Sequence, residues 1–351
     1  MKIILQKNFF TENKKEFISC GGFKIVAFKY ASGVEALEIS NTKCSFVFTP
    51  FKGQQIWHFK VGGKELSMQT TVKEPTDKTV YLENYGSFLY HCGLISMGVS
   101  DGLHPQHGEI PNAQYDSAYI CCGEDESGRY ICLGGELNHD TAFVRKYKFS
   151  PEIKLYENSS LFKINVRIEN MRAYDMEYMY LCHINFAPID NAQLICSAKC
   201  DAEHIVPYNN GGSKELMVYM DEIVKNPAVM NIVGDSKQCY DPEICCRVKY
   251  LADEQGRAYT MQYTDDGACF VSHPTDVLCN GVRWISRTKN EDAMGMVLPA
   301  TAEHIGYEHA KKTGQLKVLG PNENLEFYME AGYIEKETAQ KYKAKIEQII
   351  K

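Results

Sequence analysis

Residues 161–169 show the clearest pattern of hydrophobic and polar positions in the chain. Phe162, Ile164, Val166 and Ile168 are separated by polar residues at each odd position between them. A period of two places alternate side chains on opposite faces of an extended chain. The segment therefore predicts a β-strand with one apolar face.

Similar short runs, rich in β-branched and aromatic residues, recur along the chain. They occupy residues 23–30, 35–39, 44–50, 141–149, 176–187, 244–250, 258–263, 294–298 and 325–334. Turn-forming residues such as Gly62 and Gly63 separate the runs. Many short strands with few long helical patterns between them favour a sandwich or barrel over a parallel α/β sheet. Because no linker rich in Pro, Gly or Ser interrupts the pattern, we expect one all-β domain over residues 1–351.

Two segments near the C-terminus have a different pattern. Residues 335–351 place Tyr342, Ile346, Ile349 and Ile350 at helical spacing, which predicts a short amphipathic helix. Residues 301–313 are compatible with either a helical turn or a loop.

Composition and charge exclude several classes of protein. The net charge is −7, and no run of Lys or Arg would follow a phosphate backbone, so we expect no nucleic-acid partner. No apolar run is long enough to span a membrane, and the N-terminus lacks the pattern of a secretory signal. The 14 cysteines are scattered without a C-x-x-C pair, which is typical of free thiols in a reducing compartment. We therefore expect a cytoplasmic protein and regard the glycosylation-like triplet at Asn158 as a chance match.

The segment from His104 to Asn112 is polar and broken by prolines, yet rich in groups that bind or transfer protons. One interpretation is an exposed loop without a role. A second is a metal site formed by His104, His107 and Glu109. A third is a ligand-binding loop whose imidazole and amide groups hydrogen-bond hydroxyls.

A second histidine, His183, lies in the predicted strand at residues 176–187. By alternation, His183 and Asn185 share a face with Met179 and Leu181. A buried histidine among apolar residues is compatible with a packing role. It is also compatible with general acid catalysis, because the pKa of histidine lies near neutrality.

The order of these motifs resembles the aldose 1-epimerase (galactose mutarotase) superfamily, and most of all its divergent aldose 1-epimerase-like branch known only as a domain of unknown function. The matching parts span most of the chain; they are residues 50–56, 93–94, 107–112, 170, 183–186 and 319–323. The resemblance implies a galactose-mutarotase-like β-supersandwich with a short C-terminal helix. It also implies interconversion of sugar anomers by acid–base ring opening, without a cofactor or metal.

The resemblance implies that His183 is the general acid and that His107 helps to hold the sugar hydroxyls. The glutamate base of the family, however, falls at Leu298, which cannot accept a proton. We expect Glu303 to replace it, with Glu109 as the other candidate. Losing a general base costs about 10²–10⁴-fold in rate, so an unreplaced base would leave a catalytically silent sugar-binding protein. A metal-dependent sandwich enzyme using His104 and His107 is the third hypothesis.

Further candidates complete the predicted site. The substrate-binding candidates, besides His107 and Glu109, are Lys52, Asn112, Asn185, Trp284 and Arg287. Trp57 and Tyr115 are additional aromatic candidates for packing on a pyranose ring. We expect His273, His304 and His309 to be surface or packing residues. The expected partner is a small-molecule sugar, and a homodimer is left open.

Overall fold

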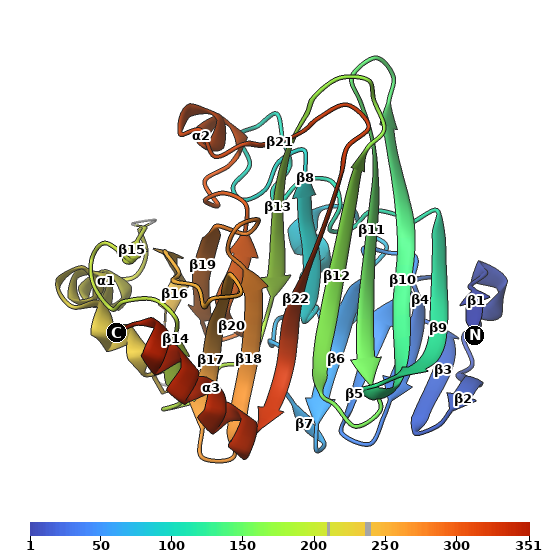
Figure 1. Cartoon of the computed structure of the whole chain (residues 1–351), viewed down its shortest axis with the longest axis horizontal. Helices are drawn as coiled ribbons and strands as arrows, with labels where there is room; N and C mark the ends of the chain where they lie inside the picture. The colour runs from blue at the N-terminus through green and yellow to red at the C-terminus, as the bar shows by residue number, and fades with distance from the viewer. Residues whose placement is uncertain (209–210, 236–239) are drawn as a thin grey trace.

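The chain forms two large β-sheets that face each other (Figure 1). The structure is a computed structural model, and it describes residues 1–208, 211–235 and 240–351. The long strands β11 (Arg145–Tyr156), β12 (Leu161–Asn170) and β22 (Asn324–Glu335) consist largely of alternating buried and less buried residues, as the sequence pattern predicts.

One sheet has nine strands in the described part of the chain. In sheet order they are β1 (Lys2–Ile4), β9 (Ser117–Asp125), β10 (Gly128–Thr141), β11 (Arg145–Tyr156), β12 (Leu161–Asn170), β22 (Asn324–Glu335), β18 (Gly267–Pro274), β17 (Arg257–Thr264) and β14 (Gln193–Cys196).

The other sheet has thirteen described strands. In sheet order they are β15 (Ile205–Pro207), β16 (Tyr240–Val248), β19 (Asn280–Arg287), β20 (Asp292–Ala300), β13 (Met176–Ile184), β8 (Leu89–Leu94), β6 (Gln55–Val61), β5 (Cys44–Thr49), β4 (Glu35–Ser40), β3 (Phe23–Lys29) and β2 (Lys15–Cys20), with β21 (Lys317–Leu319) on β13 and β7 (Lys64–Glu65) on β6.

The main hydrophobic core lies between the two sheets. Strand β12 contributes Phe162, Ile164, Val166 and Ile168, all buried, so the alternation in this segment is confirmed. The expected strand at residues 141–149 is wrong in its first part. A turn follows Thr141 and exposes 99% of Phe143, because this apolar residue lies at the tip of the β10–β11 hairpin.

Six short helices accompany the sheets in the described residues. They are α1 (Lys214–Lys225), α2 (Tyr307–Lys312), α3 (Lys336–Ile349) and the 3₁₀ segments η1 (Lys7–Phe9), η2 (Tyr81–Asn84) and η3 (Pro227–Asn231). The predicted C-terminal helix is confirmed as α3. Its buried residues Ala339 and Ile346 pack on the nine-stranded sheet beside Tyr259 and Phe270.

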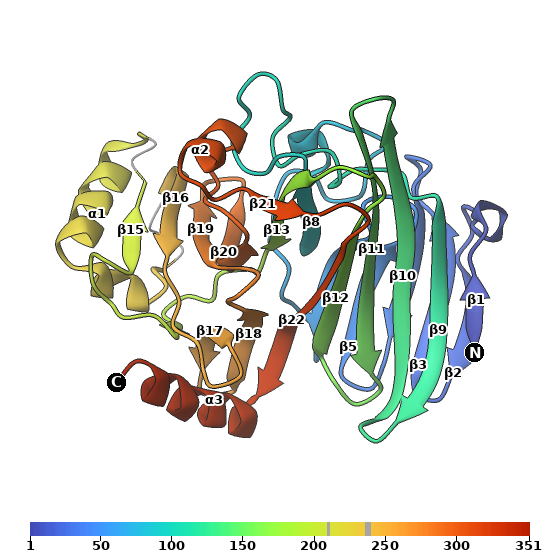
Figure 2. The same ribbon diagram turned by 45° about the horizontal axis from the view of Figure 1, so that its top comes forward.

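The thirteen-stranded sheet also buries part of its second face. A separate cluster there includes Tyr90, Met179, Leu181, Val282 and Leu298. In Figures 1 and 2 the connection from β8 to β9, drawn in teal, lies near α2 at one end of this sheet. This second cluster is separate from the core between the two sheets.

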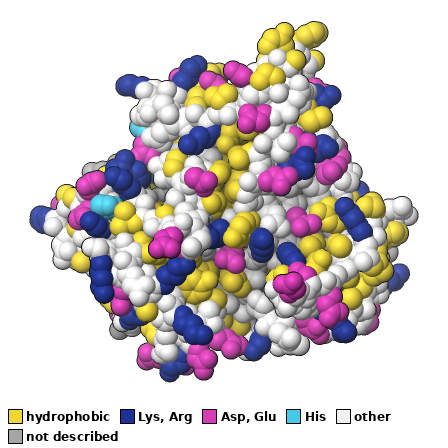
Figure 3. Space-filling view, in the orientation of Figure 1, with side chains coloured by type: hydrophobic (Ala, Val, Ile, Leu, Met, Phe, Trp, Pro, Cys, Tyr) yellow, Lys and Arg dark blue, Asp and Glu magenta, His cyan; other side chains and the backbone are white. Residues whose placement is uncertain are grey.

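Figure 3 shows basic and acidic side chains interspersed over the visible face, without a broad patch of one sign. No described helix is both long enough and apolar enough to cross a membrane. All cysteines in the described ranges are free thiols.

Candidate functional site

Strand β13 directs His183 away from the core between the sheets. Tyr180, Cys182 and Ile184 join that core, whereas Leu181 belongs to the cluster on the opposite face. The side chain of His183 lines a cavity on that opposite face. The face predicted from strand alternation is therefore confirmed.

Asn185 fixes the orientation of the His183 ring. The Asn185 amide nitrogen donates to the carbonyl of Ser87 (3.1 Å), so its amide oxygen faces His183 Nδ1 at 2.6 Å. An amide oxygen can only accept, so Nδ1 carries a proton and donates it. Nε2 of His183 is left to exchange protons, and it lies 3.4 Å from the Tyr85 hydroxyl.

His107 reaches the same cavity from the loop between β8 and β9. The centroids of the His107 and His183 rings are 5.2 Å apart. The His107 backbone has a φ of +59°, and its N–H and C=O bond to Gly98 and Gly93 respectively. A loop held at both backbone groups thus brings together two imidazoles that are 76 positions apart in the chain.

Gly108 is needed to hold this loop, because its φ is +82° and an added Cβ would overlap the carbonyl oxygens of Ser96 and Gly93. We expect Gly108→Ala to lower the free energy of unfolding by about 2–4 kcal/mol, combining backbone and overpacking costs. The control is Gly102→Ala in the same loop, where φ is +87° but no atom lies near the new methyl group. Urea unfolding of both variants checks this; equal losses would contradict the packing explanation.

Aromatic side chains form one wall of the cavity. Trp284 on β19 lies with its ring centroid 5.4 Å from that of His183, nearly perpendicular to it. Tyr85 lies 5.9 Å from Trp284, and Tyr81 lies 4.7 Å from His107. Such rings offer apolar faces on which the C–H groups of a sugar can pack.

A carboxylate that the sequence analysis missed also lines the cavity. Glu243 on β16 accepts a hydrogen bond from Trp284 Nε1 at 2.6 Å. Leu298 on β20, where the related families are expected to have their glutamate, faces the same cavity. Glu243 could be found only from the pairing of β16 with β19, which places its strand beside Trp284.

His304 is a second cavity residue that the sequence analysis did not select. Its Nε2 lies 3.3 Å from the Sγ of Cys245, and both residues line the cavity. His304 also packs against Tyr208, as expected of a packing residue, but its place in the cavity wall was not predicted. The sequence gives no pattern from which the direction of the His304 side chain could be predicted, because this residue follows β20 in an irregular segment.

Burial keeps the cavity histidines neutral near pH 7. Burial lowers the pKa of His183 to about 4, although the hydrogen bond with Asn185 opposes this shift. Burial also lowers the pKa of His304 to about 4. For His107, burial and then the neighbouring His183 and His304 hold the pKa well below its usual value. Each imidazole therefore enters the resting site as a neutral group that can accept a proton or hydrogen bond.

Glu303, the expected replacement base, has its carboxylate in a separate network. It accepts hydrogen bonds from Tyr208 (2.7 Å), His309 (2.8 Å), Gln315 (2.9 Å) and Arg247 (3.3 Å). Burial alone would raise the pKa of Glu303, but these bonds lower it to about 2. Glu303 does not line the cavity of His107 and His183, and this placement does not support a role as base.

Glu109 and Asn112 are held by local structure. The Glu109 carboxylate accepts from the backbone N–H groups of Leu94 and Ile95 and from Tyr147. Burial raises the pKa of Glu109, with the Tyr147 bond opposing it. Asn112 bonds through both ends of its amide, to Gln55, Asn84 and the carbonyls of Thr79 and Val80. Both residues brace the loop that carries His107.

Lys52 and Arg287 also lie apart from the cavity. Lys52 donates to the carbonyl of Lys78 at 2.6 Å, and burial lowers its pKa to about 8. Arg287 pairs with Asp190 and Asp292. The three-residue step from Trp284 to Arg287 places the two side chains on opposite faces of β19, so the expectation that Arg287 forms a wall of the cleft is wrong.

The remaining candidates have packing or surface roles. Trp57 and Tyr115 are buried away from the cavity. His104 forms a partly exposed pair with Asp101. In the described ranges no cluster of three or more His, Cys, Asp or Glu could hold a metal ion, which gives no support to the metal-site interpretation.

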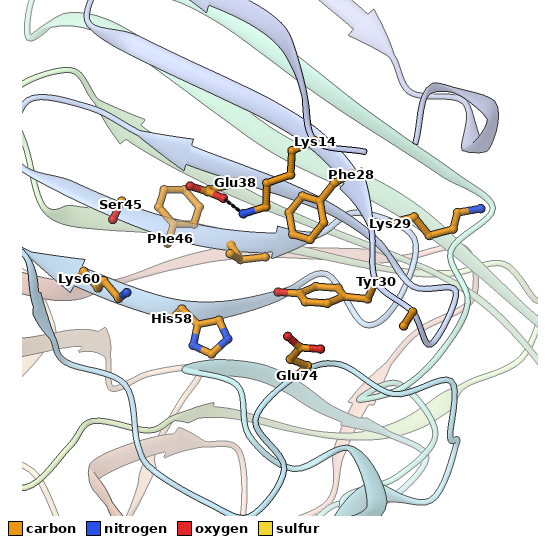
Figure 4. Close-up of a pocket in the computed structure, with 12 residues that line it drawn as sticks. Lys14, Phe28, Lys29, Tyr30, Glu38, Ser45, Phe46, His58, Lys60 and Glu74 are labelled. Atoms are coloured by element: carbon orange, nitrogen blue, oxygen red, sulfur yellow. Dashed lines mark hydrogen bonds and ion pairs between the residues drawn. The ribbon is translucent and has the colours of Figure 1, made fainter. Parts of the chain in front are cut away.

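A second hollow, of about 500 Å³, lies on the face formed by β3 to β6 (Figure 4). Its charged groups include the Lys14–Glu38 ion pair, in which both side chains are about half exposed. None of the residues predicted to bind substrate lines it. The cavity with the two histidines is thus the better candidate for a site.

Comparisons with known proteins show the family and the fold of the chain. A family model described as "Domain of unknown function (DUF4432)" matches residues 31–332. A candidate aldose 1-epimerase from Klebsiella pneumoniae has a similar structure, with a TM-score of 0.84 and 16% identity over 100% of this chain and 96% of its own. A galactose mutarotase-like protein from Clostridium acetobutylicum gives a TM-score of 0.59 at 13% identity, covering 90% of this chain and 100% of its own.

A galactose mutarotase related enzyme from Lactobacillus acidophilus gives a TM-score of 0.53 at 13% identity, over 86% of this chain and 98% of its own. No curated protein matches the sequence. These likenesses establish a galactose-mutarotase-like fold, as the motif order implies. The family model covers most of the chain, and the protein therefore belongs to the DUF4432 family.

Proposed function

We propose that this protein binds an aldose in the cavity and interconverts its anomers by proton transfer. The observation that carries the proposal is that His107, His183 and Glu243 line one cavity with an aromatic wall. Two polar atoms of this region, Tyr81 Oη and His107 Nδ1, are buried without a partner among the described residues. Buried polar groups normally have hydrogen-bond partners, so the hydroxyls of a ligand would suit them.

The proposed reaction needs one proton acceptor and one proton donor. The Glu243 carboxylate accepts the proton of the C1 hydroxyl, while protonated His183 gives its Nε2 proton to the ring oxygen. The bond from C1 to the ring oxygen breaks and an open-chain aldehyde forms. Rotation about C1–C2 and closure on the other face then return both protons. Asn185 fixes the ring so that Nε2 is the exchanging nitrogen.

The other cavity groups would bind the sugar rather than transfer protons. His107 would hydrogen-bond sugar hydroxyls, and the rings of Trp284 and Tyr85 would contact the C–H face of the pyranose. The indole N–H of Trp284 would also hold the Glu243 carboxylate in place. This arrangement replaces the carboxylate missing at Leu298 by one from a different strand.

The test is NMR of anomer exchange in freshly dissolved α-glucose, α-galactose and further aldoses, with the buffer rate subtracted. We expect acceleration by the protein and a loss of about 10²–10⁴-fold in the Glu243→Gln variant. The control is Glu303→Gln, in which the carboxylate removed lies outside the cavity, with thermal melting to check folding. A loss confined to Glu303→Gln would transfer the role of base to Glu303.

The same experiment distinguishes a silent binding protein. Sugar binding by chemical-shift changes, without acceleration for any aldose, would overturn the proposed reaction and leave carbohydrate binding. Neither binding nor acceleration would overturn both parts of the proposal.

A further inference from the structure

Arg283 is a fully buried cation at a position that the proposed reaction does not use. It lies on β19 between Val282 and Trp284, and its side chain points to the opposite face, which Ile285 shares. Its exposed fraction is 0%. Its Nε donates to the carbonyl of Met296 (3.3 Å) and its Nη2 to Cys196 Sγ (3.4 Å). Its Nη1 has no partner among the described residues.

The nearby Arg287 has carboxylate partners, whereas Arg283 has none among the described residues. Arg287 is also buried, and it is neutralised by Asp190 and Asp292 at 2.9 and 2.8 Å. Within the described ranges, no carboxylate forms an ion pair with Arg283. A guanidinium keeps its charge in proteins, and burying a charge without an opposite one costs several kcal/mol. A negative charge beside Arg283 would offset this cost.

The titratable groups around Arg283 are thiols and phenols. Burial alone would lower the pKa of Arg283, but Cys196, Tyr250 and Cys246 raise it. Burial raises the pKa of Cys246 to about 12 and raises the pKa of Tyr250 as well, even with Arg283 opposing both shifts. These two groups stay protonated near pH 7. Tyr219 and the exposed Cys200 are more distant neighbours whose pKa values burial also raises.

We propose that Cys196 is the counter-ion of Arg283, held as a thiolate in the resting protein, and that soft electrophiles modify it. Cys196 is the thiol that receives a guanidinium hydrogen bond, and it is only half-buried at the end of β14. The thiolate, rather than the thiol, is the nucleophilic form of cysteine. In alkylation by iodoacetamide, the sulfur forms the S–C bond, the C–I bond breaks and iodide leaves.

The test compares alkylation rates at pH 8 and pH 6 by peptide mass mapping of the folded protein. For an ordinary thiol with a pKa of about 8.5, the fraction present as thiolate falls roughly 75-fold from pH 8 to pH 6. We expect the rate at Cys196 to fall by less than about tenfold. Cys121, which is also half-buried, is the matched control for the accessibility of the thiol. An ordinary fall at Cys196, or no labelling of Cys196 at either pH, would overturn the proposal.

Replacing the cation supplies a second measurement. Arg283→Met is expected to lower the labelling rate of Cys196 at pH 6 by at least tenfold relative to Cys121, whereas Arg283→Lys retains most of it. An unchanged rate in Arg283→Met would show that the guanidinium does not hold the thiolate. If that variant does not fold, the pH comparison on the unmodified chain still decides. Neither measurement uses a sugar, so the result is independent of the proposed isomerase activity.

Discussion

His183→Gln is expected to lower the catalysed rate of anomer exchange by about 10²–10⁴-fold, because glutamine keeps a polar side chain of similar reach but cannot transfer a proton. The variant should still bind the sugar, since His107, Trp284 and Glu243 remain in the cavity. Saturation-transfer NMR for binding and exchange NMR for turnover measure the two effects separately. Equal losses of binding and turnover would assign His183 to binding alone.

The pH dependence of the rate tests the same role. The donor is the imidazolium, and burial lowers the pKa of His183 to about 4. The catalysed rate is therefore expected to rise close to tenfold per pH unit as the pH falls from 8 to 6. Asn185→Asp places a carboxylate beside Nδ1 and should raise the pKa of His183. The acid side of the pH–rate profile should therefore move to higher pH by about 1–3 units. An unchanged pH–rate profile in Asn185→Asp would contradict the role of His183 as the proton donor.

Acid is expected to destabilise the fold strongly, because burial keeps five histidines neutral in the folded protein, His107 of the cavity among them. Burial lowers the pKa of His91 and His273 to about 3 and of His183 and His304 to about 4. In the unfolded chain histidine has a pKa of about 6.5, so between these values the unfolded state binds more protons. Stability is therefore present above pH 6.5 and is lost as the pH falls below it.

For each such histidine, the free energy of unfolding falls by about 1.4 kcal/mol per pH unit below pH 6.5, or by about 2 kcal/mol at pH 5. His273 offers the sharpest variant, because it is fully buried and neither ring nitrogen has a partner among the described residues. We expect His273→Phe to remove about 2 kcal/mol of the loss at pH 5, while its ring can still pack against Tyr250. Urea unfolding at pH 7.5, 6 and 5 measures the difference.

His58→Asn is the matched control, since the His58 side chain is 39% exposed and asparagine tolerates the φ of +53° at this position. It removes an exposed imidazole and leaves the buried ones in place, so comparison with His273→Phe separates burial from the mere loss of a histidine. An identical dependence in His273→Phe and the parent protein would show that protonation of His273 does not limit stability in acid. The expectation that His273 and His309 are packing or surface residues is confirmed: His273 is packed in the interior, and the partly exposed His309 pairs with Glu303.

Strand periodicity was sufficient to predict part of the strands, such as β12, and the direction of His183, because both depend on neighbouring residues in the sequence. The positions of Glu243 and His304 depend instead on which distant strands pair. Strand β16 joins β19, and β20 separates β19 from β13, so residues 183, 243 and 284 meet only in the assembled sheet. No local pattern carries that information.

Polar residues in the motifs were harder to interpret than apolar ones. Glu109 and Asn112 lie in the matching segment at residues 107–112, but their side chains satisfy backbone groups of neighbouring loops. A carboxylate or amide that braces a loop has the same sequence signature as one that binds substrate. Only its hydrogen-bond partners distinguish the two, which explains why Glu303 was selected and Glu243 was missed.

The identity of residue 298 has a consequence for which sugars can enter. With leucine there, Glu243 is the one formal charge among the described lining residues, and neither Lys nor Arg is present to meet an anion. A sugar phosphate or a uronic acid would lose the water around its negative charge without gaining a positive partner. The Glu243 carboxylate would also repel it. Neutral hexoses and pentoses avoid this penalty, so the proposed site would select its ligands by charge before it selects them by the stereochemistry of their hydroxyls.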